Sequence, residues 1–419
     1  MRRVVITGIG IVCPVGNTVD DSWNALCHGV SGLGPITLFD ASTMPVRIGG
    51  EVKNFDVESI KNRWPRAESL RDRKVFLGLA AAQEAIESSG CPIEEWAKVA
   101  IHVGMSLESF FLEDVAEVAN EEDLTAILAA RTLSSLGGPL LQSPLDTLAE
   151  FLADRLSSSI PPTTNCSACA AGGQSIGLAF RQIRAGEIDI ALAGAADSML
   201  NPLGLGGFSL LKALSDENDD PKRSCRPFDV TRTGTTLGEG ASFLVLEELG
   251  RAQDRNAKIY SEIVGYGSSL DSFRVSDPDP EGNGASLAMD CALKDAKMPP
   301  QAVDAVNAHG TGTPKNDPVE IMAIKRVLGK RSFEIPIHAV KSMTGHMIAA
   351  SGALEAAVSV LSLNRNLIPP TINLAKPDPA CDLYIVKDFA KAFTGNTVLS
   401  NSFGFGGQNA ALIFRRWIP

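Results

Sequence analysis

Residues 165–199 carry the pattern that decides the fold, and they read NCSACAAGGQSIGLAFRQIRAGEIDIALAGAADSM. The apolar residues Ile176, Phe180 and Ile183 recur at helical spacing, which predicts a helix that begins just after Cys169. The apolar run at the end of this stretch is typical of a buried strand. A turn into a helix that leads on to a strand indicates an α/β fold.

The rest of the chain repeats this alternation of apolar strand-like runs and helical segments. The order of elements begins again near residue 258, so we expect two similar halves, 1–257 and 258–419. Such alternation predicts mainly parallel sheets. The opening run VVITGIG lacks the third glycine of a dinucleotide fingerprint, because cysteine stands at position 13, and nucleotide binding there is disfavoured.

The composition excludes several classes of protein. The 419 residues include 38 basic and 49 acidic ones, a net charge of −11, which argues against a nucleic-acid-binding surface. The sequence has no apolar run near the roughly 18 residues that span a bilayer, so we expect no membrane segment. Eight scattered cysteines are too few for a disulfide scaffold and indicate reduced thiols. We therefore expect a cytoplasmic protein.

Cys169 stands at the expected start of the helix and is flanked by small residues. Free backbone N–H groups and the helix macrodipole favour a thiolate at such a position. This is the layout of a nucleophile on a strand-to-helix turn. Two other interpretations stay open, a buried structural cysteine and a redox pair with Cys166. A zinc site is disfavoured, because the sequence holds no second CxxC.

Two of the five histidines stand in glycine-bracketed turns at the ends of expected strands. His309 lies in AHGTGTP, and His346 lies in KSMTGH, which also supplies Lys341. Catalytic groups commonly occupy such loops. The glycine-rich turn 401–407 could offer N–H groups to an oxyanion, so the set fits acyl transfer combined with carbanion chemistry. The other histidines lack such surroundings, and we expect structural roles for His28, His102 and His338.

A series of motifs resembles the elongating β-ketoacyl-acyl-carrier-protein synthases, which are condensing enzymes of the thiolase fold. The motifs are VVITGIG, CSAC, RPFDVTRTGTTLGEGA, NAHGTGTPKNDPVE, KSMTGH, PPTINL, CDLYIV and NSFGFGG. The resemblance implies a five-layered αβαβα fold built from two similar halves. Initiating synthases resemble a Cys-His-Asn pattern and thiolases a Cys-His-Cys one, so the histidine of KSMTGH favours the elongating class.

The resemblance also implies catalytic roles. Cys169 would accept an acyl chain as a thioester, and His309 and His346 would promote decarboxylation of a malonyl thioester and stabilise the enolate. Neutral imidazoles can donate to a developing enolate oxygen without a buried charge. Lys341 would orient or polarise this site, and Glu355 would anchor the lysine–histidine network.

Further residues would shape the substrate site. Phe405 resembles the gate between the acyl pocket and the nucleophile, and its N–H group would form the oxyanion hole together with that of Cys169. Thr311 and Thr313 resemble residues that hydrogen-bond the pantetheine arm. The resemblance adds two substrate-binding aromatic residues, Phe403 and Phe208. Two acidic residues would only brace the loop, Asp317 and Glu320.

An acyl carrier protein is acidic, so a chain of this charge needs a local basic surface to attract it. Residues 61–74, KNRWPRAESLRDRK, hold six basic residues against two acidic ones. The resemblance places the carrier-docking site near the helix that begins there, so we expect Arg71, Arg73 and Lys74 to dock the carrier. Lys212 resembles another docking cation.

The predicted activity is decarboxylative Claisen condensation of a Cys-bound acyl chain with malonyl-acyl-carrier protein in fatty-acid elongation. The phrases SCRPFD and KPDPACDL also resemble catalytic ketosynthase subunits of type II polyketide systems, and a polyene pathway or a non-catalytic acyl-binding subunit stays an alternative. We expect a homodimer, or a heterodimer with a ketosynthase-like partner. No metal or bound cofactor is implied, because the carrier protein brings the phosphopantetheine. Residues 105–150 follow the fatty-acid pattern poorly, and Phe110 and Phe111 could reshape the acyl pocket.

Overall fold

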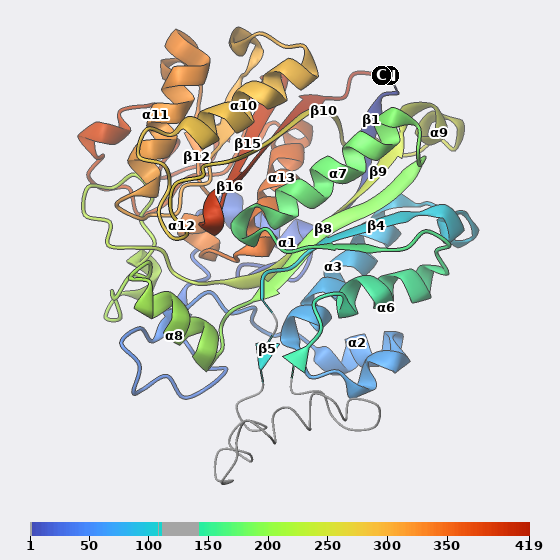
Figure 1. The fold of residues 1–419 in the computed structure, drawn as a ribbon, viewed down its shortest axis with the longest axis horizontal. Coiled ribbons are helices and arrows are strands. Elements are labelled where there is room, and N and C mark those ends of the chain that lie inside the picture. The colour runs from blue at the N-terminus through green and yellow to red at the C-terminus, as the bar shows by residue number, and fades with distance from the viewer. Residues whose placement is uncertain (1, 108, 111–141) are drawn as a thin grey trace.

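The computed structural model describes residues 2–107, 109–110 and 142–419, and a twisted sheet of ten strands runs through its middle (Figure 1). The strand order is β12-β11-β15-β16-β10-β1-β9-β8-β4-β7. Five consecutive strands belong to the first half of the chain, β1 (Val4–Val12), β4 (Ala100–Gly104), β7 (Thr163–Asn165), β8 (Ile190–Ser198) and β9 (Glu239–Glu248). The other five belong to the second half, β10 (Ser261–Leu270), β11 (Ala305–Asn307), β12 (Ile337–His338), β15 (Thr397–Phe403) and β16 (Gln408–Arg416).

The expectation of mainly parallel sheets is wrong. Five strand contacts are antiparallel, namely β1–β10, β1–β9, β10–β16, β15–β16 and β8–β9, and four are parallel, namely β11–β12, β11–β15, β4–β7 and β4–β8. The parallel pairs lie toward the outer ends of the sheet. An apolar run identifies a buried strand but does not give its direction, which depends on the connections.

The helices complete five layers, as the resemblance implied. Between the two five-stranded halves lie α7 (Ala171–Ala185) and α13 (Ala349–Arg365), which contact each other and strands of both halves. On one outer face lie α3 (Arg73–Ser89) and α6 (Thr147–Leu156), and on the other lie α10 (Asn283–Ala296) and α11 (Asn316–Leu328) (Figure 1). The short helices are α1 (Val19–Cys27), α2 (Val57–Arg63), α8 (Pro202–Leu210), α9 (Leu249–Asp254) and α12 (Lys341–Thr344).

Two Gly-x-Gly pairs repeat the same packing in both halves. A Cβ atom on Gly10 of β1 would lie 1.8 Å from the carbonyl oxygen of Ala81 in α3. A Cβ atom on Gly267 of β10 would lie 2.0 Å from the carbonyl oxygen of Ala288 in α10. The strand register also shifts next to the first glycine of each pair. The shift lies between Ile6 and Gly8 in β1 and between Ile263 and Gly265 in β10. The glycines of VVITGIG therefore admit a helix against the sheet.

Three small ribbons complete the structure, β2 (Gly34–Pro35) with β3 (Ile48–Gly49), β5 (Ser109–Phe110) with β6 (Gln142–Ser143), and β13 (Leu367–Ile368) with β14 (Lys391–Ala392). Phe111 and most of the unusual segment 105–150 lie outside the described residues. All eight cysteines are free thiols. Within the described ranges, no helix is long and apolar enough to cross a membrane.

Candidate active site

Cys169 lies on a short 3₁₀ turn, Ala168–Ala170, that carries the chain from β7 into α7. Ala168 adopts a φ of 47°, in the left-handed region that residues with a Cβ atom disfavour. This strained turn sets Cys169 at the head of α7, where its side chain is only 2% exposed. The predicted position of the cysteine at a helix start therefore agrees with the structure.

Burial controls the protonation of this thiol and raises its pKa to about 11. The N–H groups of Phe405 and Cys169 and the charge of Lys341 lower the pKa, but they do not outweigh the loss of water around the thiolate. The backbone N–H groups favour the thiolate, as expected for this position, but burial has the larger effect in the resting site. The thiol is protonated at neutral pH and must gain its nucleophilic character as it reacts.

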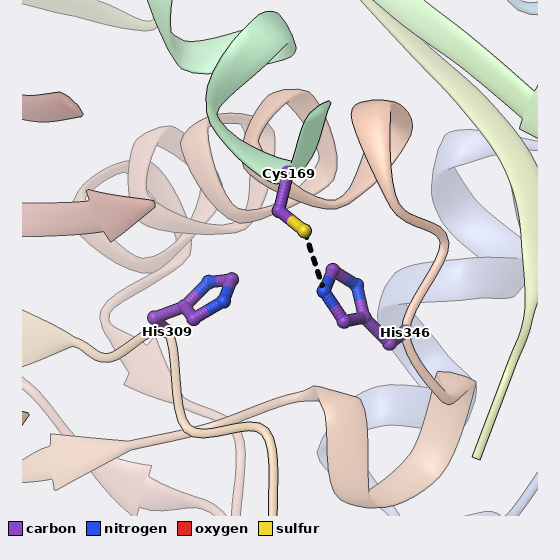
Figure 2. A group of neighbouring side chains, drawn as sticks. All are labelled: Cys169, His309 and His346. Carbon is purple, nitrogen blue, oxygen red and sulfur yellow. Dashed lines mark hydrogen bonds between the residues drawn. The ribbon is translucent and has the colours of Figure 1, made fainter. Parts of the chain in front are cut away.

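His346 follows α12, and its ring faces the thiol of Cys169 (Figure 2). Its Nε2 atom lies 3.1 Å from Cys169 Sγ. On the other side of the ring, Nδ1 accepts the backbone N–H of Ile348 at 3.1 Å and lies 3.0 Å from Oγ of Ser351. Because a backbone N–H only donates, Nδ1 presents its lone pair and the ring hydrogen is on Nε2.

His309 is held by Lys341 and shows the same proton arrangement. Lys341 Nζ donates to the His309 carbonyl oxygen at 2.6 Å, to His309 Nδ1 at 3.2 Å and to the carboxylate of Glu355. A lysine ammonium has three donors and no acceptor, so Nδ1 of His309 is also unprotonated and its Nε2 carries the hydrogen. Lys341 and Glu355 are each 1% exposed, which makes them a buried ion pair.

The two imidazole rings are neutral donors in this site. Burial and the nearby charge of Lys341 lower the pKa of both His309 and His346 well below the usual value. The ring centroids are 5.3 Å apart, and the ligand atoms of Cys169, His309 and His346 all lie within 4.8 Å of one another. Such a set could in principle bind a metal ion, but two Nε2–H groups suit an oxygen that gains negative charge rather than a cation.

The turn after β15 brings a second group of donors to Cys169. The N–H of Phe405 lowers the pKa of the thiol, against the larger opposite effect of burial. A Cβ atom on Gly404 would lie 3.0 Å from the Cys169 nitrogen, so this turn passes very close to the nucleophile. The N–H groups of Cys169 and Phe405, which were predicted for the oxyanion hole, both act on the reacting sulfur and lower its pKa.

A cavity of about 210 Å³ leads to Cys169, and its lining includes both histidines. The predicted aromatic residues also line it, with Phe208 and Phe405 in ring contact at 5.8 Å and Phe403 against His309 at 5.9 Å. Cys169 belongs to an apolar cluster with Phe208 and other buried side chains, Met199, Leu200, Leu205, Leu237 and Ile348. This environment suits an aliphatic chain close to the nucleophile.

The predicted pantetheine-binding threonines line the same cavity. Oγ1 of Thr311 lies 3.0 Å from Oγ1 of Thr313, whose oxygen also accepts the N–H of Asn316. Arg232, which sequence reasoning missed, donates to the carbonyl oxygen of Thr313 at 3.0 Å and pairs with Asp378 at 2.6 Å. A buried arginine thus fixes the wall that carries the threonines.

The carrier-docking prediction is wrong for Lys74 and stays a prediction for the other residues. Lys74 is fully buried, donates to the Leu107 carbonyl oxygen and lies 3.3 Å from Asp72, because it faces inward in the first turn of α3. Arg73 is largely buried and binds the carboxylate of Glu239 at 2.7 Å. Lys74 therefore has no surface to offer a partner, whereas the Arg73 side chain is 25% exposed but already paired with Glu239. Two predicted docking residues are exposed, Arg71 and Lys212, and Lys212 also lines the cavity.

The remaining predicted residues have structural contacts. Glu320 accepts the N–H groups of His309 and Gly310, and Asp317 accepts those of Phe228 and Gly312, as braces of the histidine loop. The other histidines lie outside this cluster. His102 contacts Thr163 and Gln182, His28 contacts the Asn24 carbonyl, and His338 is fully buried. The thiol of Cys166 points to the carbonyl oxygen of Ser106 at 2.6 Å.

Family models match both halves of the chain. The β-ketoacyl synthase N-terminal domain matches residues 1–252, and the β-ketoacyl synthase C-terminal domain matches residues 260–375. The 3-oxoacyl-[acyl-carrier-protein] synthase 2 of Coxiella burnetii is 41% identical over 417 residues and covers 99% of each chain. That of Synechocystis is 40% identical over 417 residues, covering 99% of this chain and 98% of the relative.

Solved structures share the fold over the whole chain. A β-ketoacyl synthase from Burkholderia phymatum has a TM-score of 0.87 at 32% identity, covering 100% of both chains. The ishigamide ketosynthase/chain length factor has a TM-score of 0.85 at 33% identity, covering 100% of both chains. A type II polyketide acyl-carrier protein in complex with its ketosynthase gives a TM-score of 0.85 at 30% identity, covering 99% of this chain and 100% of that one.

Proposed function

Because this chain belongs to the β-ketoacyl synthase family, we propose that it joins a Cys169-bound acyl chain to malonyl-acyl-carrier protein in fatty-acid elongation. The observation that carries this proposal is a buried thiol faced by two neutral Nε2–H donors, with His346 Nε2 3.1 Å from Sγ. Curated relatives at 40% and 41% identity that are named 3-oxoacyl-[acyl-carrier-protein] synthase 2 support the pathway. The product is a β-ketoacyl-acyl-carrier protein, and the enzyme is an acyltransferase.

In the first step the acyl chain moves to Cys169. The sulfur attacks the thioester carbon of the acyl carrier, the carbon–sulfur bond to pantetheine breaks, and the thiol proton passes to the leaving sulfur. Negative charge that forms on the attacked oxygen is held by the N–H groups of Cys169 and Phe405. The Nε2–H of His346 stabilises charge on the attacking sulfur, which lowers the barrier for a thiol whose pKa is about 11.

In the second step a malonyl thioester binds between the two histidines. Its carboxylate leaves as CO₂, and the electron pair moves to the thioester oxygen, where the Nε2–H groups of His309 and His346 stabilise the enolate. The enolate carbon attacks the acyl group, the bond to Cys169 breaks, and the sulfur takes up one proton from solvent. The Lys341–Glu355 pair keeps His309 oriented throughout.

Polyketide synthesis is the second candidate pathway, favoured by a different observation. The solved structures that match the full chain include a type II polyketide ketosynthase and a ketosynthase/chain length factor, at 30% and 33% identity. The chemistry at Cys169 would be identical, so only the acyl substrate and the partner differ. Competition between saturated and polyketide acyl-carrier thioesters for acylation of Cys169 separates the two pathways.

The proposed partners are an acyl carrier protein and a second ketosynthase-like chain. A solved structure of an acyl-carrier protein in complex with its ketosynthase supports the first, and a solved ketosynthase/chain length factor supports the second. Strand β7 ends the ten-stranded order, and a terminal strand can pair with another chain. A homodimer is the simplest assembly, and light scattering of the purified chain tests it. A cytoplasmic location and the absence of any cofactor beyond carrier-borne phosphopantetheine stay predictions.

The test of the proposed function is covalent labelling with a radiolabelled acyl-carrier thioester. We expect label on Cys169 in the native chain and in Cys166→Ala, and none in Cys169→Ala. An unlabelled native chain would rule out the condensing enzyme, and loss of label in Cys166→Ala alone would make Cys166 the nucleophile. The variant His309→Ala should keep acyl transfer and lose condensation, and unchanged condensation would remove His309 from the mechanism.

A further inference from the structure

Ser351 touches the catalytic centre from the side opposite the nucleophile. It lies in the first turn of α13 and its side chain is buried. Its Oγ atom lies 3.0 Å from Nδ1 of His346 and 2.9 Å from the backbone nitrogen of Met347. The hydroxyl of Ser351 therefore lies between the His346 ring and the backbone N–H of Met347. The direction of each of these two hydrogen bonds has to be determined.

Three hydrogen bonds determine where that hydrogen lies. The N–H of Met347 can only donate, so it occupies a lone pair of Ser351 Oγ. The N–H of Ile348 can only donate, so Nδ1 of His346 is an unprotonated acceptor. The contact between Ser351 and Nδ1 must then use the hydroxyl hydrogen of Ser351. The serine links a helix N–H on one side to the imidazole lone pair on the other.

We infer that Ser351 is a positioning residue that donates to Nδ1 of His346 and orients the ring so that its Nε2–H faces Cys169 Sγ. The kinetic consequence rests on the proposed function, whereas the position of the proton does not. A hydrogen on Nδ1 would face the N–H of Ile348, which only donates, so that bond would be lost, whereas the hydroxyl of Ser351 could turn and accept. The Ile348 N–H therefore disfavours both the other neutral tautomer and the imidazolium ion. With the tautomer set in this way, the bond from Ser351 to Nδ1 holds the ring in one orientation toward the reacting sulfur.

The other groups around His346 either favour the neutral ring or leave its proton position unaffected. Lys341 of α12 is cationic and disfavours a second positive charge on the ring. The His309 ring meets it edge to face at 82°, and Cys169 faces Nε2 from the head of α7. Asp197 of β8 is the nearby acidic group, and its carboxylate accepts the Ala349 N–H at the start of α13. None of these groups donates a hydrogen to Nδ1.

A purely structural role for Ser351 would be helix capping through the Met347 N–H. Such a role changes the thermal stability of the chain and leaves the hydrogen bonding of His346 Nδ1 unchanged. The matched control is Ser362→Ala, because Ser362 is also buried in α13 and its hydroxyl makes no hydrogen bond within the described part of the chain. It tests the loss of a buried serine hydroxyl without a change at the site.

The experiment is NMR of the full chain with ¹⁵N-labelled histidine, with His346 identified by its loss in His346→Gln. We expect the native ring to be neutral with hydrogen on Nε2, and Ser351→Ala to shift the Nδ1 resonance toward that of a less hydrogen-bonded nitrogen. Condensation kcat should fall about fivefold, the loss of one net hydrogen bond, with KM nearly unchanged. Ser362→Ala should match the native chain in both measurements.

Three results would overturn the inference. The first is a hydrogen on Nδ1 of His346 in the native chain. This result needs no variant, so the inference can be refuted even if Ser351→Ala fails to fold. An unchanged Nδ1 resonance in a folded Ser351→Ala chain reduces Ser351 to a cap. A changed resonance with unchanged condensation refutes the kinetic part alone. The NMR result holds even if the acyl-labelling test of the proposed function fails, so the two failures are distinguishable.

Discussion

Replacing Gly404 by alanine tests the oxyanion hole through a single methyl group. The backbone of Gly404 has φ −129° and ψ 161°, which alanine adopts without strain. The new Cβ atom would lie 3.0 Å from the Cys169 nitrogen and 3.2 Å from the Ala170 nitrogen. Carbon contacts are most favourable at roughly 3.5–4.0 Å, so one of the two turns must move by several tenths of an ångström.

That displacement acts on the donor geometry directly. An oxyanion-hole donor works at about 2.7–3.1 Å from the oxygen, and removing one donor costs about 10²–10³-fold in rate. Because the Cys169 N–H is pushed aside and partly covered, we expect acyl transfer to fall about 100-fold. Overpacking of this kind also destabilises a core by roughly 1–3 kcal/mol, so the variant should still fold.

The assay is rapid quenching of the acyl-transfer reaction, with acyl-Cys169 measured by intact mass. The matched control is Gly207→Ala on α8, where an added Cβ atom meets no described atom within 4 Å and the rate should stay at the native value. Thermal denaturation verifies that both variants are folded. A folded Gly404→Ala chain that transfers acyl groups within about threefold of the native rate would show that the Cys169 N–H does not serve the oxyanion.

Three further predictions concern the charges of the site. Alkylation of Cys169 by iodoacetamide should rise about tenfold per pH unit from pH 7 to about 10, because only the thiolate reacts and the thiol pKa is about 11; a plateau below pH 9 would contradict that value. Glu355→Gln leaves the buried charge of Lys341 without its partner and should lower the free energy of unfolding by about 3–5 kcal/mol in urea denaturation, and a loss under about 1 kcal/mol would mean that Lys341 and Glu355 do not form a charged pair there. Arg232→Lys keeps the charge but loses the planar fork that holds the Thr313 carbonyl, so KM for the acyl-carrier thioester should rise about tenfold with kcat nearly constant; an unchanged KM would remove Arg232 from substrate binding.

The elements around the nucleophile could be predicted because local spacing defines them. The spacing of the apolar residues after Cys169 predicted the buried face of a helix, and α7 begins at Ala171 as expected. Strand direction could not be predicted. The strands β8 and β9 pair antiparallel because of the connection between them, and the apolar runs of the sequence do not indicate the path of that connection. The repeat was visible only as an order of elements, although Gly8-x-Gly10 and Gly265-x-Gly267 repeat the same helix-on-strand contact.

Charged residues were harder to predict than catalytic ones. A run of basic residues indicates a charged surface only if its side chains point outward. Arg73 instead meets Glu239, which is 166 positions away, and buried Lys74 donates to the carbonyl oxygen of Leu107. The catalytic groups followed from their motifs, but the proton positions did not. These depend on the N–H of Ile348 and on the three donors of Lys341, which only the folded backbone places.

The division of the catalytic groups between the two halves of the sheet makes the reaction a property of their assembly. Cys169 comes from the first half, whereas His309 and His346 come from the second, and the halves join through β1 with β10 and through α7 with α13. Each fragment of a chain cut between β9 and β10 would carry an incomplete set of reacting groups. Activity of such a nicked enzyme would persist while the fragments stay bound and vanish on dilution, so turnover itself would report their dissociation constant.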